Sequence, residues 1–331
     1  MSAQLKSPTS RKPPPRPPFV FSWAKAPRVA AGTKLVIELP VARLASGSWA
    51  HMPVAVVHGA HAGKTAWVSG AVHGDELNGI EIVRRLLQGV SPKSLRGTLL
   101  AIPIVNVFGV MNRSRYLPDR RDLNRSFPGS SRGSMASRLA RLFYDEVVSR
   151  SELGIDFHTG SAGRSNHPHL RCDLDNPETQ RLARAFGAPV TYHAKTRDGS
   201  LRGAAVDAGV QTLLYEGGEA HRFNEDAVAI AVDGAMRTLA AMGMVTEAAE
   251  SAVPTVEVRK SRWMRASRAG FARIRVPLGS RVREGDMIAT VGDAFGSHEV
   301  PVRSRVTGIV IGVLQEPQVH RGDALVHVAE A

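Results

Sequence analysis

Residues 65–79 read TAWVSGAVHGDELNG, and this stretch decides the class of fold. Its first part, Thr65–Ser69, is a short, largely apolar run that ends at a glycine, which predicts a strand. From Leu77 to Leu87, apolar residues recur at helical spacing, which predicts a helix with one buried face. A strand, a turn and a helix in this order are the unit from which α/β folds are built.

The same alternation continues to residue 243. Further strands are predicted at 35–39, 54–57, 98–102, 154–157 and 210–215, and further helices at 135–149, 177–187 and 224–243. Strands that alternate with helices favour a largely parallel or mixed sheet covered on both faces. The stretch 106–134 is rich in arginine, proline, glycine and asparagine and has no periodicity, so we expect a long functional loop there.

The two ends of the chain depart from this pattern. Residues 1–18 contain six prolines and four basic residues, which predicts a disordered Pro/Arg-rich tail. The composition changes near 244–253, and residues 270–328 show short strands separated by glycine without a long helical pattern. We therefore expect an α/β domain at 19–248 and a β-rich accessory domain at 249–331, in line with about two domains for 331 residues.

The chain is strongly basic, with a net charge of +13 from 43 lysines and arginines, of which 35 are arginines. Such a field can attract anionic small molecules or nucleic acid, or it can reflect an arginine-biased solvated surface. The sequence has no lysine-rich arm and no basic–aromatic stacking motif, so nucleic-acid binding is not expected.

The sequence lacks membrane-spanning and secretory segments and has a single cysteine, and these features bear on where the protein is located. No run of about 18 apolar residues predicts a membrane helix, and no apolar secretory segment is present, so we expect a cytoplasmic protein. Cys172 is the single cysteine, which excludes an internal disulfide, and we interpret it as an inert, partly buried thiol.

Three potential metal ligands follow two of the predicted strands. His73 and Glu76 follow the first strand, and residues three apart on a helical turn share a face, so this pair can bind one cation. His158 ends the strand at 154–157, and ligands in α/β sheets bind at the carboxyl ends of strands. Two histidines and a carboxylate form a catalytic zinc set that leaves a position for water. A helix-start motif and a hydrogen-bonded turn histidine are the alternatives.

Two further segments carry candidate chemistry. Residues 115–129 read RYLPDRRDLNRSFPG, and guanidinium groups bind carboxylates bidentately and stabilise oxyanions. Glu216 ends the strand at 210–215 and is followed by two glycines, which makes it a candidate general base. A salt bridge at the strand end is the alternative for Glu216.

Four strings in this order resemble the succinylglutamate desuccinylase/aspartoacylase family, a branch of the zinc carboxypeptidase-like hydrolases. They are HGDELNG at 73–79, NR at 124–125, DFHTG at 156–160 and EGG at 216–218, and the resemblance covers roughly residues 50–245. It implies a mixed sheet flanked by helices. It also implies a deacylase that hydrolyses the amide bond of a small anionic N-acyl amino acid or N-acyl amine.

The resemblance also implies roles for single residues. It implies one Zn²⁺ held by His73, Glu76 and His158, with Glu216 as the catalytic acid/base. A metallocarboxypeptidase acting on peptides and a non-catalytic binding protein on the same fold are the competing functions.

The family resemblance further implies that Asn124 and Arg125 hold a substrate carboxylate and that Arg115 polarises the scissile carbonyl. Close competitors for this last role are Arg113, Arg120 and Arg121. Arg202 is a candidate for contact with an anionic substrate, with a surface arginine as the alternative.

His167 and His169 follow His158 closely and are interpreted as the lip of a substrate pocket, a second metal site or plain loop histidines. The C-terminal part also has a familiar string. Residues 276–291 are similar to the half-motif of lipoyl/biotinyl-type β-sandwich domains, but residues 261–331 contain no lysine, which excludes a swinging prosthetic group. We expect a structural or substrate-gating module, and a chain that can form a homo-oligomer.

Overall fold

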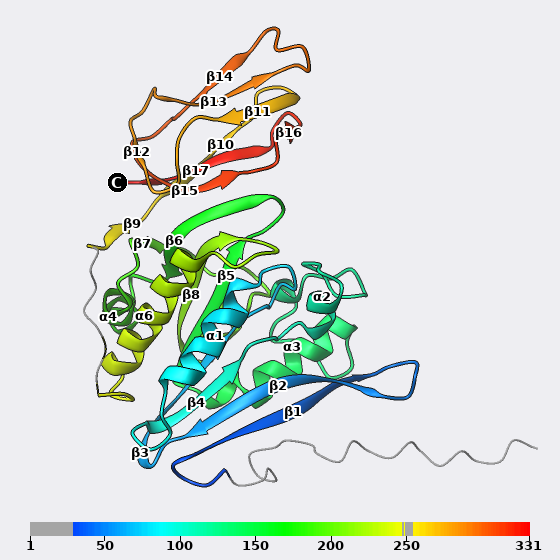
Figure 1. Ribbon diagram of the computed structural model, residues 1–331, viewed down its shortest axis with the longest axis vertical. Helices are drawn as coiled ribbons and strands as arrows, with labels where there is room; N and C mark the ends of the chain where they lie inside the picture. Colours follow the sequence, from blue (N-terminus) through cyan, green and yellow to red (C-terminus); the bar gives the residue numbers. More distant parts are fainter. Residues whose placement is uncertain (1–28, 247, 249–253) are drawn as a thin grey trace, which may run out of the picture.

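The computed structural model describes residues 29–246, 248 and 254–331. The predicted tail at 1–18 therefore lies outside the described residues. The mixed α/β fold with a large sheet and flanking helices is confirmed (Figure 1).

Residues 29–246 contain eight strands and six α-helices. The strands are β1 (Thr33–Arg43), β2 (Trp49–His58), β3 (His61–Ser69), β4 (Arg96–Ile102), β5 (Leu153–Gly160), β6 (Arg164–Cys172), β7 (Val190–His193) and β8 (Gln211–Glu219). The helices are α1 (Asn78–Gly89), α2 (Val107–Met111), α3 (Met135–Glu146), α4 (Pro177–Phe186), α5 (Leu201–Asp207) and α6 (Glu225–Ala241). Two short 3₁₀ turns are η1 (Leu123–Arg125) and η2 (Val148–Arg150).

The large sheet runs in the order β1-β2-β4-β3-β5-β8-β6-β15-β17-β10. Its centre, β4-β3-β5-β8, is parallel, and β2 and β6 join it antiparallel on either side. All strands and helices predicted before residue 243 overlap an observed element. The sequence analysis missed β6, β7 and α5, which are short or polar segments without a clear hydrophobic period.

Both faces of the sheet are covered, as predicted. The core on one face contains apolar residues of α1, α4 and α6, while the core on the other face contains residues of α3 and α5. Successive side chains of β3 point to opposite faces of the sheet, so this strand contributes to both cores. Val68 belongs to the first core and Trp67 to the second. Figure 1 shows α1, α4 and α6 together beside the sheet.

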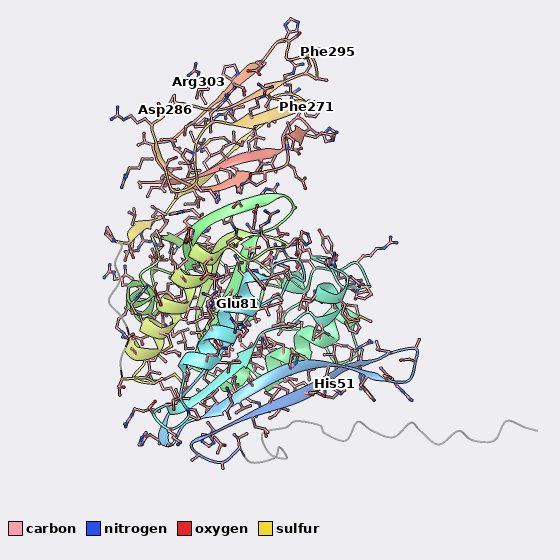
Figure 2. All side chains as sticks on the ribbon, viewed as in Figure 1. His51, Glu81, Phe271, Asp286, Phe295 and Arg303 are labelled. Carbon is pink, nitrogen blue, oxygen red and sulfur yellow. The ribbon has the colours of Figure 1, made fainter. Side chains whose placement is uncertain are left out.

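The C-terminal part is built of short strands. They are β9 (Val256–Val258), β10 (Ser261–Arg265), β11 (Gly270–Ile274), β12 (Arg281–Val282), β13 (Met287–Gly292), β14 (Val300–Arg303), β15 (Gly308–Leu314), β16 (Gln318–Val319) and β17 (Ala324–Glu330). A second sheet has the order β14-β13-β11-β16. Phe271 lies on this sheet, and Phe295, 94% exposed, lies in the loop between β13 and β14 (Figure 2).

Some of the C-terminal strands join the large sheet instead of the second one. β15 pairs antiparallel with β6, placing Gly312 opposite Asn166 and Leu314 opposite Arg164. Strands β15, β17 and β10 therefore extend the large sheet, because β6 offers them an edge with unpaired backbone groups. The division of the chain at residue 248 and the likeness to a lipoyl-type sandwich stay predictions.

The contact between Gly154 of β5 and Trp67 of β3 offers a test of core packing. A Cβ atom at position 154 would lie 2.1 Å from the Trp67 ring. We expect Gly154→Ala to lower the free energy of unfolding by about 1–3 kcal/mol or more, measured by urea denaturation, because the buried ring must move. Gly89→Ala is the matched control: no heavy atom lies within 4 Å of its new methyl, so its stability should be unchanged or slightly higher. Equal stability of both variants would contradict this account of the core.

Candidate metal centre and active site

His73, Glu76 and His158 form a buried cluster at the carboxyl ends of β3 and β5. Their ligand atoms all lie within 4.8 Å of one another, and none of the three side chains is more than 4% exposed. β3 and β5 are parallel neighbours, so the residues that follow them meet at one edge of the sheet. The structure thus brings together the three residues that the sequence placed at this edge.

Glu76 lies between the two imidazoles. Its Oε1 is 2.7 Å from Nδ1 of His73, and its Oε2 is 2.8 Å from Nδ1 of His158. The backbone N–H of Thr159 also donates to Oε2, at 3.1 Å. Both Nδ1 atoms therefore face the same carboxylate, so the three side chains are placed to bind one cation. This donor set suits Zn²⁺ and also accepts other divalent ions.

A carboxylate engages the second nitrogen of each imidazole. His158 Nε2 is 2.7 Å from Asp156 Oδ2, and the Ser69 hydroxyl donates to Asp156 Oδ1 at 2.7 Å. His73 Nε2 is 3.2 Å from Asp122 Oδ1. Metal-binding histidines usually donate their second N–H to such a group, which fixes the ring and its tautomer. These contacts fit a metal bound through both Nδ1 atoms. The sequence analysis gave no role to Asp122 or Asp156, because only the fold shows what they contact.

The charges in the cluster follow from burial and close contacts. Burial disfavours the ionised form of Glu76, but the adjacent imidazoles of His73 and His158 overcome this and hold the pKa of Glu76 well below its usual range. Burial likewise disfavours the charged form of His158, yet Asp156 and Glu76 raise its pKa. Glu76 is therefore ionised at physiological pH, as a carboxylate ligand must be.

The turn that carries His73 and Glu76 differs from the expected helical turn. α1 begins only at Asn78, and the Glu76 N–H donates to the His73 carbonyl at 3.2 Å, which closes a separate turn. The backbone of this turn packs closely against α2. A Cβ atom at position 74 would lie only 1.9 Å from the carbonyl carbon of Gly109, so only glycine fits there. Close packing on α2, which no sequence pattern shows, holds the segment outside the helix.

The region 106–134 is also more ordered than predicted. It contains α2 and η1, each started by a side-chain cap: Asn106 accepts from the Gly109 N–H and Asp122 accepts from the Asn124 N–H. Caps stabilise such short helices without an apolar period, which is why the periodicity analysis missed them.

Arg115 is placed beside the cluster. Its Nη2 donates to Asp122 Oδ2 at 2.9 Å, and its Nη1 lies 3.4 Å from Glu76 Oε1. The competing arginines are exposed and do not line the cavity described below; they are Arg113, Arg120 and Arg121.

Glu216 lies on β8, directly opposite His158 of β5. Its Oε2 accepts a hydrogen bond from Asn166 Nδ2 at 2.9 Å, and Arg171 Nη1 is 3.5 Å from its Oε1. Burial raises the pKa of Glu216, partly offset by His158 and Arg171. A carboxylate with a raised pKa is a better proton acceptor, so this position suits acid–base chemistry.

Asn124, Arg125 and Arg202 line the same cavity. Asn124 Oδ1 accepts from the Leu201 N–H at 2.8 Å, which ties η1 to α5. Arg125 donates to the Asn124 carbonyl. Arg202 is only 5% exposed, so the alternative of a surface arginine is wrong; its Nη2 donates to the Lys195 carbonyl at 2.7 Å, and burial lowers its pKa to about 10.

The cavity has a volume of about 630 Å³ and is lined by both parts of the chain. Besides the residues already named, its lining includes Arg164, Arg197, His169, Ser261, Trp263 and His327. The sequence analysis gave no role to the C-terminal residues among them, because their place depends on the pairing of β15 with β6.

The remaining sequence candidates have clear positions. His167 and His169 lie on β6 rather than in a loop, and His169 lines the cavity, as the interpretation of a pocket lip requires. Neither belongs to a metal-binding group among the described residues. Cys172 is a buried free thiol, and burial raises its pKa to about 12, which fits an inert residue.

The catalytic-domain model of succinylglutamate desuccinylase/aspartoacylase matches residues 62–242, which is more than half of the chain and includes the whole metal cluster. The chain belongs to this family.

Relatives of this family member match over most of its length. An N-alpha-acetyl-L-2,4-diaminobutyric acid deacetylase from Halomonas elongata is 30% identical over 312 residues, covering 89% of this chain and 90% of that protein. A succinylglutamate desuccinylase/aspartoacylase structure from Rhodobacter sphaeroides has a TM-score of 0.82 at 25% identity. The product-bound ectoine utilization protein EutE (DoeB) from Ruegeria pomeroyi has a TM-score of 0.81 at 24% identity, which shows the shared fold. Both structures match over 92% of this chain and 98% of theirs.

None of the helices that the structure describes has the length and apolar character needed to cross a bilayer.

Metal binding by this family member can be tested at His158. We expect His158→Ala to lose bound zinc after loading and dialysis, because one of three protein ligands is removed; elemental analysis measures the metal content. His193→Ala is the control. His193 forms a second group with Asp173 and Asp175, but its Nδ1 accepts from the Leu174 N–H and Asp175 pairs with Arg259. Unchanged zinc in His158→Ala, or its loss in His193→Ala, would contradict the assignment.

Proposed function

We propose that this chain is a metal-dependent deacylase that hydrolyses the amide bond of a small N-acyl amino acid or related N-acyl amine. The observation that carries the proposal is the buried His73–Glu76–His158 cluster, which shares one cavity with Glu216 and several arginines. The deacetylase from Halomonas elongata supports the reaction type, since its name describes the removal of an acetyl group from an amino acid. The proposed reaction is therefore the hydrolysis of a linear amide bond other than a peptide bond.

His73, Glu76 and His158 would hold the ion, with zinc as the proposed metal. A divalent ion there lowers the pKa of water and polarises the acyl oxygen. Asp156 and Asp122 orient the two histidine rings through their Nε2 atoms, which would leave both Nδ1 atoms to hold the ion.

Glu216 moves the proton. In the proposed mechanism its carboxylate accepts a proton from the attacking water and passes it to the nitrogen of the leaving amine. Asn166 and Arg171 hold the carboxylate in place, through Oε2 and Oε1 respectively. Both carboxylate oxygens of Glu216 are therefore held in place before the substrate binds.

The arginines act on the substrate. Arg115 donates N–H bonds to the developing oxyanion, a type of contact worth about 3–4 kcal/mol in other enzymes. Asn124 and Arg125 bind the carboxylate of the amino acid, with the planar guanidinium as the bidentate partner. Arg202 is a further contact for an anionic substrate.

Glu216→Gln tests the proton-transfer role. The variant should keep its metal, since the ligands are untouched, while kcat for an N-acyl amino acid falls about 10²–10⁴-fold. Glu219→Gln is the matched control, because Glu219 lies on the same strand and pairs with Arg222 outside the cavity. Normal turnover by Glu216→Gln would remove Glu216 from the mechanism.

The overall proposal is tested with a panel of N-acyl amino acids, N-acyl amines and peptides, assayed on protein of known metal content. We expect release of the free acid from N-acyl substrates, loss of this activity on chelation and its return with zinc. Release of C-terminal residues from peptides instead would favour a metallocarboxypeptidase. A binding protein would show no metal-dependent hydrolysis at all.

A further inference from the structure

Strand β1 ends the large sheet and is paired on one side only among the described strands. Its partner there is β2, and Figure 1 shows β1 on the outer side of β2. β1 spans Thr33–Arg43, whereas β10, at the other end of the sheet, spans only Ser261–Arg265. The backbone groups of such an edge can pair with another strand. The register with β2 shifts between Pro40 and Ala42, so the uninterrupted edge is residues 33–39.

The register with β2 shows which backbone groups point to this edge. Glu38 lies opposite Pro53 of β2, and proline has no N–H to donate. Facing residues of antiparallel strands alternate between pairs that exchange two hydrogen bonds and pairs that exchange none. Glu38 and Pro53 are therefore a pair of the second kind, as are the pairs of β1 residues two and four positions earlier, Val36 and Lys34. The backbone N–H and C=O groups of these three β1 residues consequently point away from β2.

The side chains of the same three residues are exposed and form a symmetric pattern of charge. Val36 is 61% exposed and lies midway between Lys34, which is also exposed, and Glu38, whose side chain is 71% exposed. Lys34 Nζ donates to the Leu87 carbonyl at 3.3 Å, and Glu38 Oε2 lies 3.9 Å from His51 Nδ1. The order along the edge is positive, apolar, negative. Such an order is complementary to itself when a second copy of the strand runs antiparallel.

One antiparallel register satisfies both the backbone groups and the charges. With a twofold axis at Val36, Lys34 lies opposite Glu38 of the second copy, and all three outward residues exchange backbone hydrogen bonds. An axis at Lys34 or at Glu38 would place like charges opposite each other, which is unfavourable. An axis at Leu35 or Ile37 would place Val36 opposite a charged residue. The edge therefore favours one arrangement over its neighbours.

We propose that two copies of this chain associate through β1, antiparallel and in the register centred on Val36. The two large sheets then form one continuous sheet across a twofold axis, as in other cases of strand addition. On one face of the sheet Val36 packs against its own copy. On the other face Leu35, which is 40% exposed, lies opposite Ile37 of the second copy. The inference does not depend on the proposed function, since no β1 residue lines the cavity.

Sedimentation equilibrium of the full chain tests the association. A single pair of strands is a small interface, so the measurement extends to about 200 μM chain. We expect a mass that rises with concentration towards twice the chain mass of 35.6 kDa. A mass of 35.6 kDa at every concentration overturns the proposal, because the edge is then occupied within the chain or stays unpaired.

Exchange of the two charges tests the register. Lys34→Glu and Glu38→Lys each place like charges opposite each other, so we expect the Kd of the dimer to rise about tenfold or more in either variant. The double variant, and an equimolar mixture of the two single variants, restore opposite charges and should restore the dimer. Lys93→Glu is the matched control, because it changes the net charge equally at an exposed position outside β1. Native association of both single variants, or failure of their mixture to associate, overturns the proposal.

A proline at position 36 tests the backbone pairing. Because the Val36 N–H points away from β2, Val36→Pro removes a donor of the proposed interface and leaves the β1–β2 hydrogen bonds in place. We expect this variant to be monomeric where the native chain is dimeric. Val36→Thr keeps the N–H and the branched shape, so it should still dimerise. Circular dichroism checks that both variants are folded. A folded, dimeric Val36→Pro overturns the proposal, and the charge exchange decides if Val36→Pro fails to fold.

Discussion

The contact of the Glu76 carboxylate with two imidazoles is the interaction on which the rest of the site depends. Glu76 and His158 are 82 residues apart in sequence, and only the parallel pairing of β3 with β5 brings them together. A buried carboxylate is costly unless positive or hydrogen-bonding partners surround it. The imidazoles of His73 and His158 are these partners, and the carboxylates of Asp122 and Asp156 in turn contact the second nitrogen of each imidazole.

The contacts of Asp122 join the polar stretch 106–134 to this cluster. Asp122 caps η1, bonds His73 and accepts a hydrogen bond from Arg115. One carboxylate thus fixes a backbone turn, a candidate metal ligand and the guanidinium nearest to the cluster. Rigid placement of charged groups matters here because preorganised dipoles stabilise a developing charge without reorganising during the reaction.

Much of the α/β part could be predicted from sequence, because buried strands and amphipathic helices leave a clear hydrophobic period. The convergence of His73, Glu76 and His158 followed from one rule about the carboxyl ends of strands. The contact of Asp122 with His73 and the place of Trp263 in the lining of the cavity could not be predicted. Their roles depend on a side-chain cap and on the pairing of β15 with β6, and neither leaves a local signal in the sequence.

The pairing of β15 with β6 makes one hydrogen-bonded surface out of two stretches of chain that differ in composition. β6 contributes Asn166 and Arg171 next to the Glu216 carboxylate on one side and pairs with β15 on the other. Substitutions in the last seventy residues can therefore reshape the far end of the cavity while every motif that defines the family stays intact. The shape of that end of the cavity can thus change without any change in the cluster of His73, Glu76 and His158.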